Sequence, residues 1–132
     1  MKNKYISLIL SFVLVVLMVA PAVSAAETPV TRTTSSETGI KYLSWCKNTI
    51  TWTSTSTQIT SSDAWQKVNG IYIKGRGATK LNMSNDKSHY YNFKYTYLLG
   101  LDFGGVTLGY AKDYIDQGLV NFTGLRYWDL SL

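Results

Sequence analysis

The only cysteine and the only histidine of the chain, Cys46 and His89, are the side chains best suited to nucleophilic or base chemistry. A hydrolase needs a nucleophile, a base and a group that orients the base. Ser88 precedes His89, but neighbouring residues of a strand point to opposite faces, so these two side chains cannot pair in the simple way. Cys46 lies in a strand-like segment, not at a helix N-terminus that would lower the pKa of its thiol. We therefore expect no enzyme activity, and we interpret Cys46 as a half-buried free thiol.

Asp113 and Asp116 are the most suggestive pair of carboxylates, three residues apart in the segment Lys112–Gln117. This segment has a helical pattern, and Gly118 stands where a short helix would end in a left-handed cap. Two carboxylates on one exposed helical turn do not face each other across a cleft, as those of a glycosidase do. They also lack the dense oxygen spacing of a calcium loop. The single Cys excludes a zinc site ligated by cysteines, and the single His excludes a metal site with several histidines. We expect no catalytic residue, no metal and no cofactor.

The segment Gly75–Lys80 (GRGATK) contains residues that are common in phosphate-binding loops. It lacks the spacing G-x-x-x-x-G-K-[ST], and no helix follows to offer its N-terminus to a phosphate. We interpret it as a bend or bulge between strands. The chain has no run of four or more basic residues, so we expect no nucleic acid as a partner.

Tyrosines that alternate with apolar residues provide the candidate binding site. Tyr72 lies between two isoleucines and Tyr90 precedes Tyr91, so both should project from the outer face of their strands. An outward tyrosine beside a cation suits stacking on a sugar ring or packing against a protein. The alternative is ordinary cross-strand packing on a sheet surface. The candidate site comprises the two tyrosines and three nearby cations: Tyr72, Lys74, Arg76, Tyr90 and Lys94.

The elements that must position these residues have the period of β-strands. In His89–Leu99 the aromatic residues alternate with polar ones, which predicts one core face with Tyr91, Phe93, Tyr95 and Tyr97. Asn69-Gly70 favours a type I′ hairpin between Ala64–Val68 and Ile71–Lys74. Lys47-Asn48 is expected to turn the chain between Ile40–Cys46 and Thr49–Thr55, and Gly104-Gly105 to close a further hairpin.

About eight short strands separated by turn residues predict an all-β fold, a small antiparallel sandwich or barrel with one short helix near the C-terminus. Residues 1–25 are expected to be a signal peptide: Lys2 and Lys4 precede a 15-residue apolar run, and small residues follow Pro21. The apolar run is shorter than the roughly 20 residues that span a bilayer. Residues 26–39 are polar and rich in Thr and Ser, so we expect a flexible leader, and residues 40–132 form the single β-rich domain.

Composition and charge narrow the function. The chain is 45% hydrophobic and 14% aromatic, too apolar for disorder. Lys2 and Lys4 account for two of its 13 basic residues, which with 8 acidic ones leaves +3 for residues 26–132. This charge permits weak attraction to anionic surfaces. We expect a secreted, non-enzymatic domain with a signal peptide of bacterial type, and we expect it to bind an extracellular protein or a cell-wall glycan. The alternative is a membrane-active or antibacterial toxin, suggested by the Thr-rich alternation of Thr49–Ser62.

Overall fold

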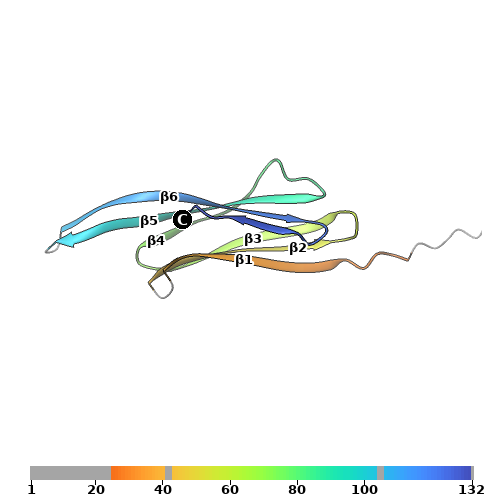
Figure 1. The fold of residues 1–132 in the computed structure, drawn as a ribbon, viewed down its shortest axis with the longest axis horizontal. Coiled ribbons are helices and arrows are strands. Elements are labelled where there is room, and N and C mark those ends of the chain that lie inside the picture. The colour runs from red at the N-terminus through yellow and green to blue at the C-terminus, as the bar shows by residue number, and fades with distance from the viewer. Residues whose placement is uncertain (1–24, 41–42, 104–105, 132) are drawn as a thin grey trace, which may run out of the picture.

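The computed structural model describes residues 25–40, 43–103 and 106–131, with only the backbone for 99–108 and 110. Apart from Ala25, the predicted signal peptide lies outside these residues. Two antiparallel sheets stack face to face (Figure 1), one of three strands and one of four, so the predicted all-β class is confirmed. The strands are β1 (Val30–Ile40), β2 (Ser44–Ser54), β3 (Ile59–Gly70), β4 (Ile73–Lys80), β5 (Ser88–Phe103), β6 (Val106–Asn121) and β7 (Arg126–Asp129). Their order is β1-β2-β3 in one sheet and β4-β5-β6-β7 in the other.

The core consists of alternate residues of β2, β5 and β6, which face the opposite sheet. Phe93 and Trp52 are buried in a cluster with four further residues, Ile50, Ile59, Tyr91 and Val120. Tyr95 and Tyr97 belong to a second cluster with Cys46 and Ile73. The predicted core face of the aromatic strand is therefore confirmed for Tyr91, Phe93, Tyr95 and Tyr97. Full burial of such a side chain contributes roughly 1.5–3 kcal/mol.

A buried carboxylate lies between the sheets. Asp116 of β6 is 0% exposed and accepts four hydrogen bonds. Thr38 Oγ1 and Asn48 Nδ2 donate to Oδ2 over 3.0 and 2.9 Å, and the Tyr95 hydroxyl and Ser131 N–H each donate to Oδ1 over 3.0 Å. Four donors match the four acceptor sites of a carboxylate, so this polar group is satisfied without water.

The short helix expected over Lys112–Gln117 is absent, because this segment is part of β6. It pairs with β5 throughout, with Lys112 opposite Tyr97 and Gln117 opposite Asn92. Asp113 and Asp116 therefore lie on opposite faces of a strand, the first exposed and the second buried. The helical pattern was misleading because the inward face of this stretch carries Asp116 instead of an apolar residue.

The flexible leader expected over residues 26–39 is also wrong over most of its length. Val30–Ile40 forms strand β1, paired with β2 along all its residues. The buried face of β1 is polar, and two of its hydroxyls have partners across the sandwich: Thr34 Oγ1 accepts from Trp128 Nε1 at 3.1 Å, and Thr38 Oγ1 donates to Asp116. The turn expected at Lys47-Asn48 does not exist either, since both residues lie inside the continuous strand β2.

Asn69-Gly70 does not form the expected hairpin. β3 ends at Gly70 and β4 begins at Ile73, but the two strands belong to different sheets. The connection is a crossing from one layer of the sandwich to the other. Gly70 has a φ of +119°, and a side chain there would collide with the Leu43 carbonyl. Glycine is thus required at this position for a sheet crossing, not for a hairpin.

β5 and β6 form the longest hairpin, which extends past the rest of its sheet (Figure 1). β4 pairs with β5 only up to Tyr97, and β7 pairs with β6 only from Gln117 onward. The predicted Gly104-Gly105 turn lies outside the described residues, but Phe103 pairs with Val106 on either side of it, as a hairpin requires.

Candidate binding site on the outer face of the four-stranded sheet

The register of β5, β6 and β7 places an apolar row across the outer face of the four-stranded sheet. Tyr90 pairs with Leu119, and Leu119 pairs with Tyr127. These residues alternate with the core residues of their strands, so they face away from the three-stranded sheet. Adjacent strands are about 4.8 Å apart, which puts the two tyrosine backbones about 10 Å from each other.

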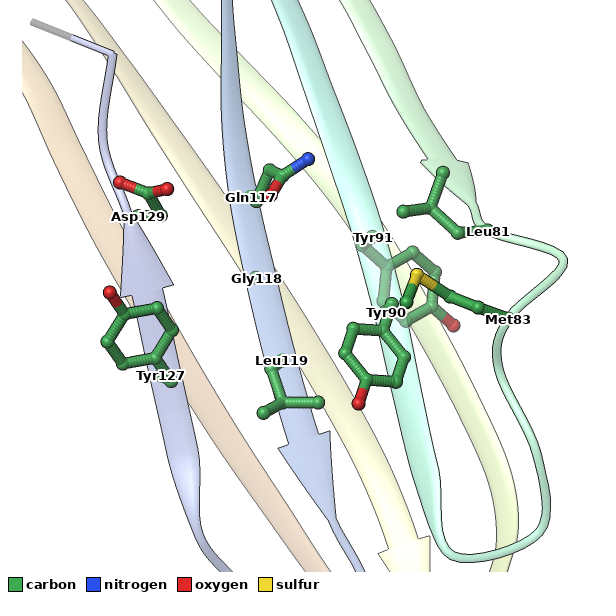
Figure 2. A pocket seen from close by; sticks show the side chains of 9 residues that line it. All are labelled: Leu81, Met83, Tyr90, Tyr91, Gln117, Gly118, Leu119, Tyr127 and Asp129. Carbon is green, nitrogen blue, oxygen red and sulfur yellow. The ribbon is translucent and has the colours of Figure 1, made fainter.

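This row forms one wall of a hollow of about 200 Å³. Figure 2 shows the three side chains in a row, with Met83 and Leu81, from the segment that follows β4, beyond Tyr90 at one end of this row. Tyr127 and Met83 are each 61% exposed. We call this site the aromatic hollow; its lining residues are Leu81, Met83, Tyr90, Tyr91, Gln117, Gly118, Leu119, Tyr127 and Asp129.

A polar row borders the apolar one. Asn92 pairs with Gln117, and Gln117 pairs with Asp129. Gln117 Nε2 donates to Asn92 Oδ1 over 3.1 Å, which holds the two amides side by side. Each amide NH₂ carries two donors, so this contact uses only one of the four N–H groups. The hollow therefore combines apolar surface with amide and carboxylate groups along one edge.

A second hollow, of about 300 Å³, lies further along β5. Lys94 is exposed on the same face as Tyr90, and Arg76 lies beside it. Arg76 Nε donates to Thr96 Oγ1 over 3.0 Å, and Thr96 Oγ1 donates to Asp113 Oδ1 over 2.6 Å. We call this site the basic hollow; its lining residues are Arg76, Lys94, Tyr95, Asp113, Tyr114 and Ile115.

A β-bulge in β4 directs Arg76 to this face. Gly75 pairs with Tyr95 and Gly77 with Lys94, so Arg76 is the extra residue. The sequence predicted a bend or bulge between two strands, and the bulge is present, but it lies within the single strand β4. Gly77 has a φ of +91°, which favours glycine. In a regular strand Lys74 would lie opposite Thr96 and Arg76 opposite Lys94. Because of the extra residue, the Arg76 side chain also reaches Thr96, so both cations lie beside this residue.

Two amide side chains, from β2 and β3, hold the bulge in place. Gly77 N–H donates to Gln66 Oε1 over 3.1 Å, and Gln66 Nε2 donates to Asn48 Oδ1 over 3.1 Å. Asn48 Nδ2 in turn donates to Asp116. This polar relay connects the bulge to the buried carboxylate at the centre of the sandwich.

The structure separates the five residues of the predicted site. Arg76 and Lys94 line the basic hollow, and Lys74 pairs with Thr96 at its border. Tyr90 lines the aromatic hollow instead. Tyr72 lies in the bend between the two sheets, half exposed, and not in a strand as the sequence suggested.

Several residues of the aromatic hollow were missed by the sequence analysis, above all Leu119, Tyr127 and Met83. Their neighbours in the hollow come from other parts of the chain. Tyr90, Leu119 and Tyr127 lie close together only because of the register of three strands. The available signal was alternation: Tyr127 precedes the inward Trp128, as Tyr90 precedes Tyr91.

His89 contacts a serine, but Ser62 of β3 and not its neighbour Ser88. Ser62 Oγ is 2.5 Å from both His89 Nδ1 and the Tyr91 hydroxyl. Lys80 Nζ lies 3.3 Å from His89 Nε2. The roles of donor and acceptor at these two contacts follow from which ring nitrogen carries the proton. Burial, followed by the charge of Lys80, lowers the pKa of His89.

Cys46 is fully buried and its thiol donates to Asn48 Oδ1 at 3.2 Å. Burial, and next the nearby Asp116, raises the pKa of Cys46 to about 12. The thiol is thus more buried than the sequence analysis expected. It packs with Ile73, Tyr95 and Tyr97, away from the contacts of His89.

Within the described ranges, no group of three or more His, Cys, Asp or Glu side chains could hold a metal ion. The part of the chain that the structure describes also has no helix of the length and apolarity needed to cross a membrane. Comparison with family models, curated proteins and solved structures gives no match to this chain. The functional argument therefore depends on the geometry of the two hollows.

Proposed function

We propose that the chain is a small secreted, non-enzymatic module that binds a partner in the cell envelope or outside the cell. The observation that carries this proposal is the aromatic hollow, where Tyr127 and Met83 are 61% exposed beside Tyr90. Single exposed apolar side chains are common on protein surfaces, but a group of them around a concave site is typical of a binding surface.

The environment of the reactive side chains supports a function without catalysis. Among the described residues, the side chains in hydrogen-bond contact with His89 are Ser62 and Lys80, and neither is a carboxylate that would orient the ring as a base. The Cys46 thiol, with a pKa of about 12, stays protonated at neutral pH. Asp113 and Asp116 lie on opposite faces of β6 and cannot share a substrate.

Export is supported by the N-terminal sequence. Cleavage after Ala25 or Ala26 leaves small residues at both recognition positions. The mature chain should therefore begin at Ala26 or Glu27. Mass spectrometry of the culture medium tests this expectation, and a membrane-bound product that retains Met1 would overturn it.

A sedimentation assay with purified bacterial cell wall tests the binding function. The mature chain should pellet with the wall, and Tyr127→Ala should weaken this binding about tenfold, the effect of losing about 1.4 kcal/mol. Tyr72→Ala is the matched control, because it removes another exposed tyrosine, which lies outside both hollows. Equal binding by the wild type and Tyr127→Ala would contradict the proposed site.

A membrane-active protein is the second candidate, and it is favoured by the β5–β6 hairpin. Beyond Tyr97 these strands pair only with each other among the described strands. Their register sets Leu99, Leu101 and Phe103 opposite Tyr110, Leu108 and Val106, alternating with pairs of small or polar residues. The Thr49–Ser62 stretch does not support this candidate, because Ile50, Trp52 and Ile59 are all buried in the core.

Dye release from anionic phospholipid vesicles separates the two candidates. A membrane-active chain should release the dye at low micromolar concentration, and Leu101→Glu should abolish release while leaving the sandwich folded. A binding module should release none.

A further inference from the structure

We propose that the outer face of the four-stranded sheet binds an acidic polysaccharide, with one sugar ring in the aromatic hollow and an acidic group of the same chain at the basic hollow. This inference rests on the binding function proposed above and names the class of its ligand.

The two hollows lie on one face and are connected along a single strand. Tyr90 and Lys94 are both outward residues of β5, four positions apart. At about 3.3 Å per residue, their backbones are about 13 Å apart. Asn92 lies between them and belongs to the polar row. A ligand that uses both hollows must therefore be extended and must carry polar groups along its length, as a polysaccharide of a few sugar units does.

The aromatic hollow has the chemistry of a sugar site. A pyranose ring has a face of C–H groups and a rim of hydroxyls, so it needs apolar area with hydrogen-bonding groups at the edge. Tyr90, Leu119 and Tyr127 form the apolar row, and Asn92, Gln117 and Asp129 form the adjacent polar row. A volume of about 200 Å³ is below the roughly 300–1,000 Å³ of sites for larger molecules. It suits a single ring.

The basic hollow is suited to an acidic group. The Arg76 guanidinium is held through Nε by Thr96, which leaves its remaining N–H donors for a ligand. Their planar fork matches a carboxylate or a phosphate. Lys94 adds a second cation, while Asp113 accepts from Thr96. Two cations against one carboxylate give this hollow a net positive charge, and Lys74 adds another cation in the row of Thr96.

The main test compares polygalacturonate oligosaccharides with the same oligosaccharides after methyl esterification, by titration calorimetry of the mature chain. Esterification removes the negative charge and keeps the sugar. We expect the esterified form to bind about tenfold more weakly. Lys94→Gln and Arg76→Gln should each weaken binding of the acidic form several-fold and reduce its dependence on salt. Tyr127→Ala should weaken binding of both forms.

Lys67→Gln is the matched control, because Lys67 is an exposed lysine of β3 on the other sheet. A poly(glycerol phosphate) arm separates the two sources of acidic groups: tighter binding of this polymer than of polygalacturonate assigns the basic hollow to phosphate, and weaker binding assigns it to carboxylate. Either result supports an acidic ligand if Lys94→Gln weakens binding of the polymer that binds more tightly.

Two outcomes would overturn the inference. Equal binding of the acidic and esterified oligosaccharides, unaffected by Lys94→Gln, would show a neutral glycan site and leave the proposed binding function intact. Failure of every polymer to bind, while the cell wall still captures the chain through Tyr127, would indicate another class of partner, such as a protein. Loss of wall binding altogether would overturn both the inference and the proposed function.

Discussion

Asp116→Asn tests whether the buried carboxylate organises the sandwich. The substitution keeps the volume of the side chain and replaces one acceptor oxygen with an NH₂ group. Asn48 Nδ2 only donates and is fully buried, so the new amide must keep its oxygen on that side. Its NH₂ then faces the Tyr95 hydroxyl and the Ser131 N–H, which donate to Oδ1 in the wild type.

The cost follows from what each neighbour can do. The Tyr95 hydroxyl can rotate to accept, and the exposed Ser131 N–H can turn to water. The remaining loss is the conversion of charge-assisted bonds into neutral ones, about 0.5–1.5 kcal/mol each. We expect Asp116→Asn to lower the free energy of unfolding by about 2 kcal/mol. Asp116→Ala should cost about 4 kcal/mol, because it leaves the buried donors of Asn48 and Tyr95 without an acceptor.

Urea denaturation measures both values, and Asp113→Asn provides the matched control. Asp113 lies three residues earlier on the same strand but is exposed, so its substitution should cost no more than about 0.5 kcal/mol. Hydrogen exchange at the Ser131 amide should increase in Asp116→Asn alone. If Asp116→Asn and Asp113→Asn reduced stability equally, the buried carboxylate would not have the role argued here.

The pKa of Cys46 is about 12. A thiol reagent at pH 8 should therefore label the native chain on the order of a thousandfold more slowly than the unfolded chain. Equal labelling rates would contradict the burial of the thiol. Between pH 9 and 12 the thiol ionises in the unfolded chain but stays protonated in the folded chain. The free energy of unfolding should therefore fall in this range, by at most about 1.4 kcal/mol per pH unit from this group. Cys46→Ala should reduce this slope. The pKa of His89 in the folded chain is below 6.5, so on acidification the imidazole is protonated first in the unfolded chain. The free energy of unfolding should therefore fall as the pH drops below about 6.5. An NMR titration midpoint of His89 at or above 6.5 would refute this. Tyr95→Ala should cost about 3 kcal/mol or more as a core cavity, while Tyr90→Ala should cost less than about 1 kcal/mol; urea curves in the reverse order would refute the assignment of the faces of β5.

The fold could be predicted where apolar and polar residues alternate on a strand. His89–Leu99 shows this alternation, and the structure confirms its core face. The prediction failed where polar side chains are buried. The inward face of β1 carries Thr34, Ser36 and Thr38, and that of β6 includes Asp116. Hydrophobic periodicity cannot detect such strands, because their burial depends on partners that lie far away in the sequence.

Turn residues predicted where the chain changes direction, but not which sheet the next strand joins. Asn69-Gly70 requires an unusual backbone, as the φ of +119° at Gly70 shows. Sequence alone does not distinguish a return along the same sheet from a crossing to the other. The same limit applies to the candidate site: the outward direction of Tyr90 followed from alternation, but its neighbours Leu119 and Tyr127 depend on pairings across three strands.

The polar relay gives one physical reason why a small β-domain would bury hydrophilic residues. Two apolar clusters pack between the sheets, but apolar contacts are non-directional and do not fix a bulge. The chain of hydrogen bonds from Asp116 through Asn48 and Gln66 ends on the Gly77 N–H, next to Arg76, which lines the basic hollow. Each amide in this chain has one orientation that satisfies both neighbours, so the core determines the position of Gly77. The guanidinium of Arg76 is then held from the other side by Thr96. Stability and binding are thereby linked, because the interactions that satisfy the buried carboxylate also position a cation on the outer face.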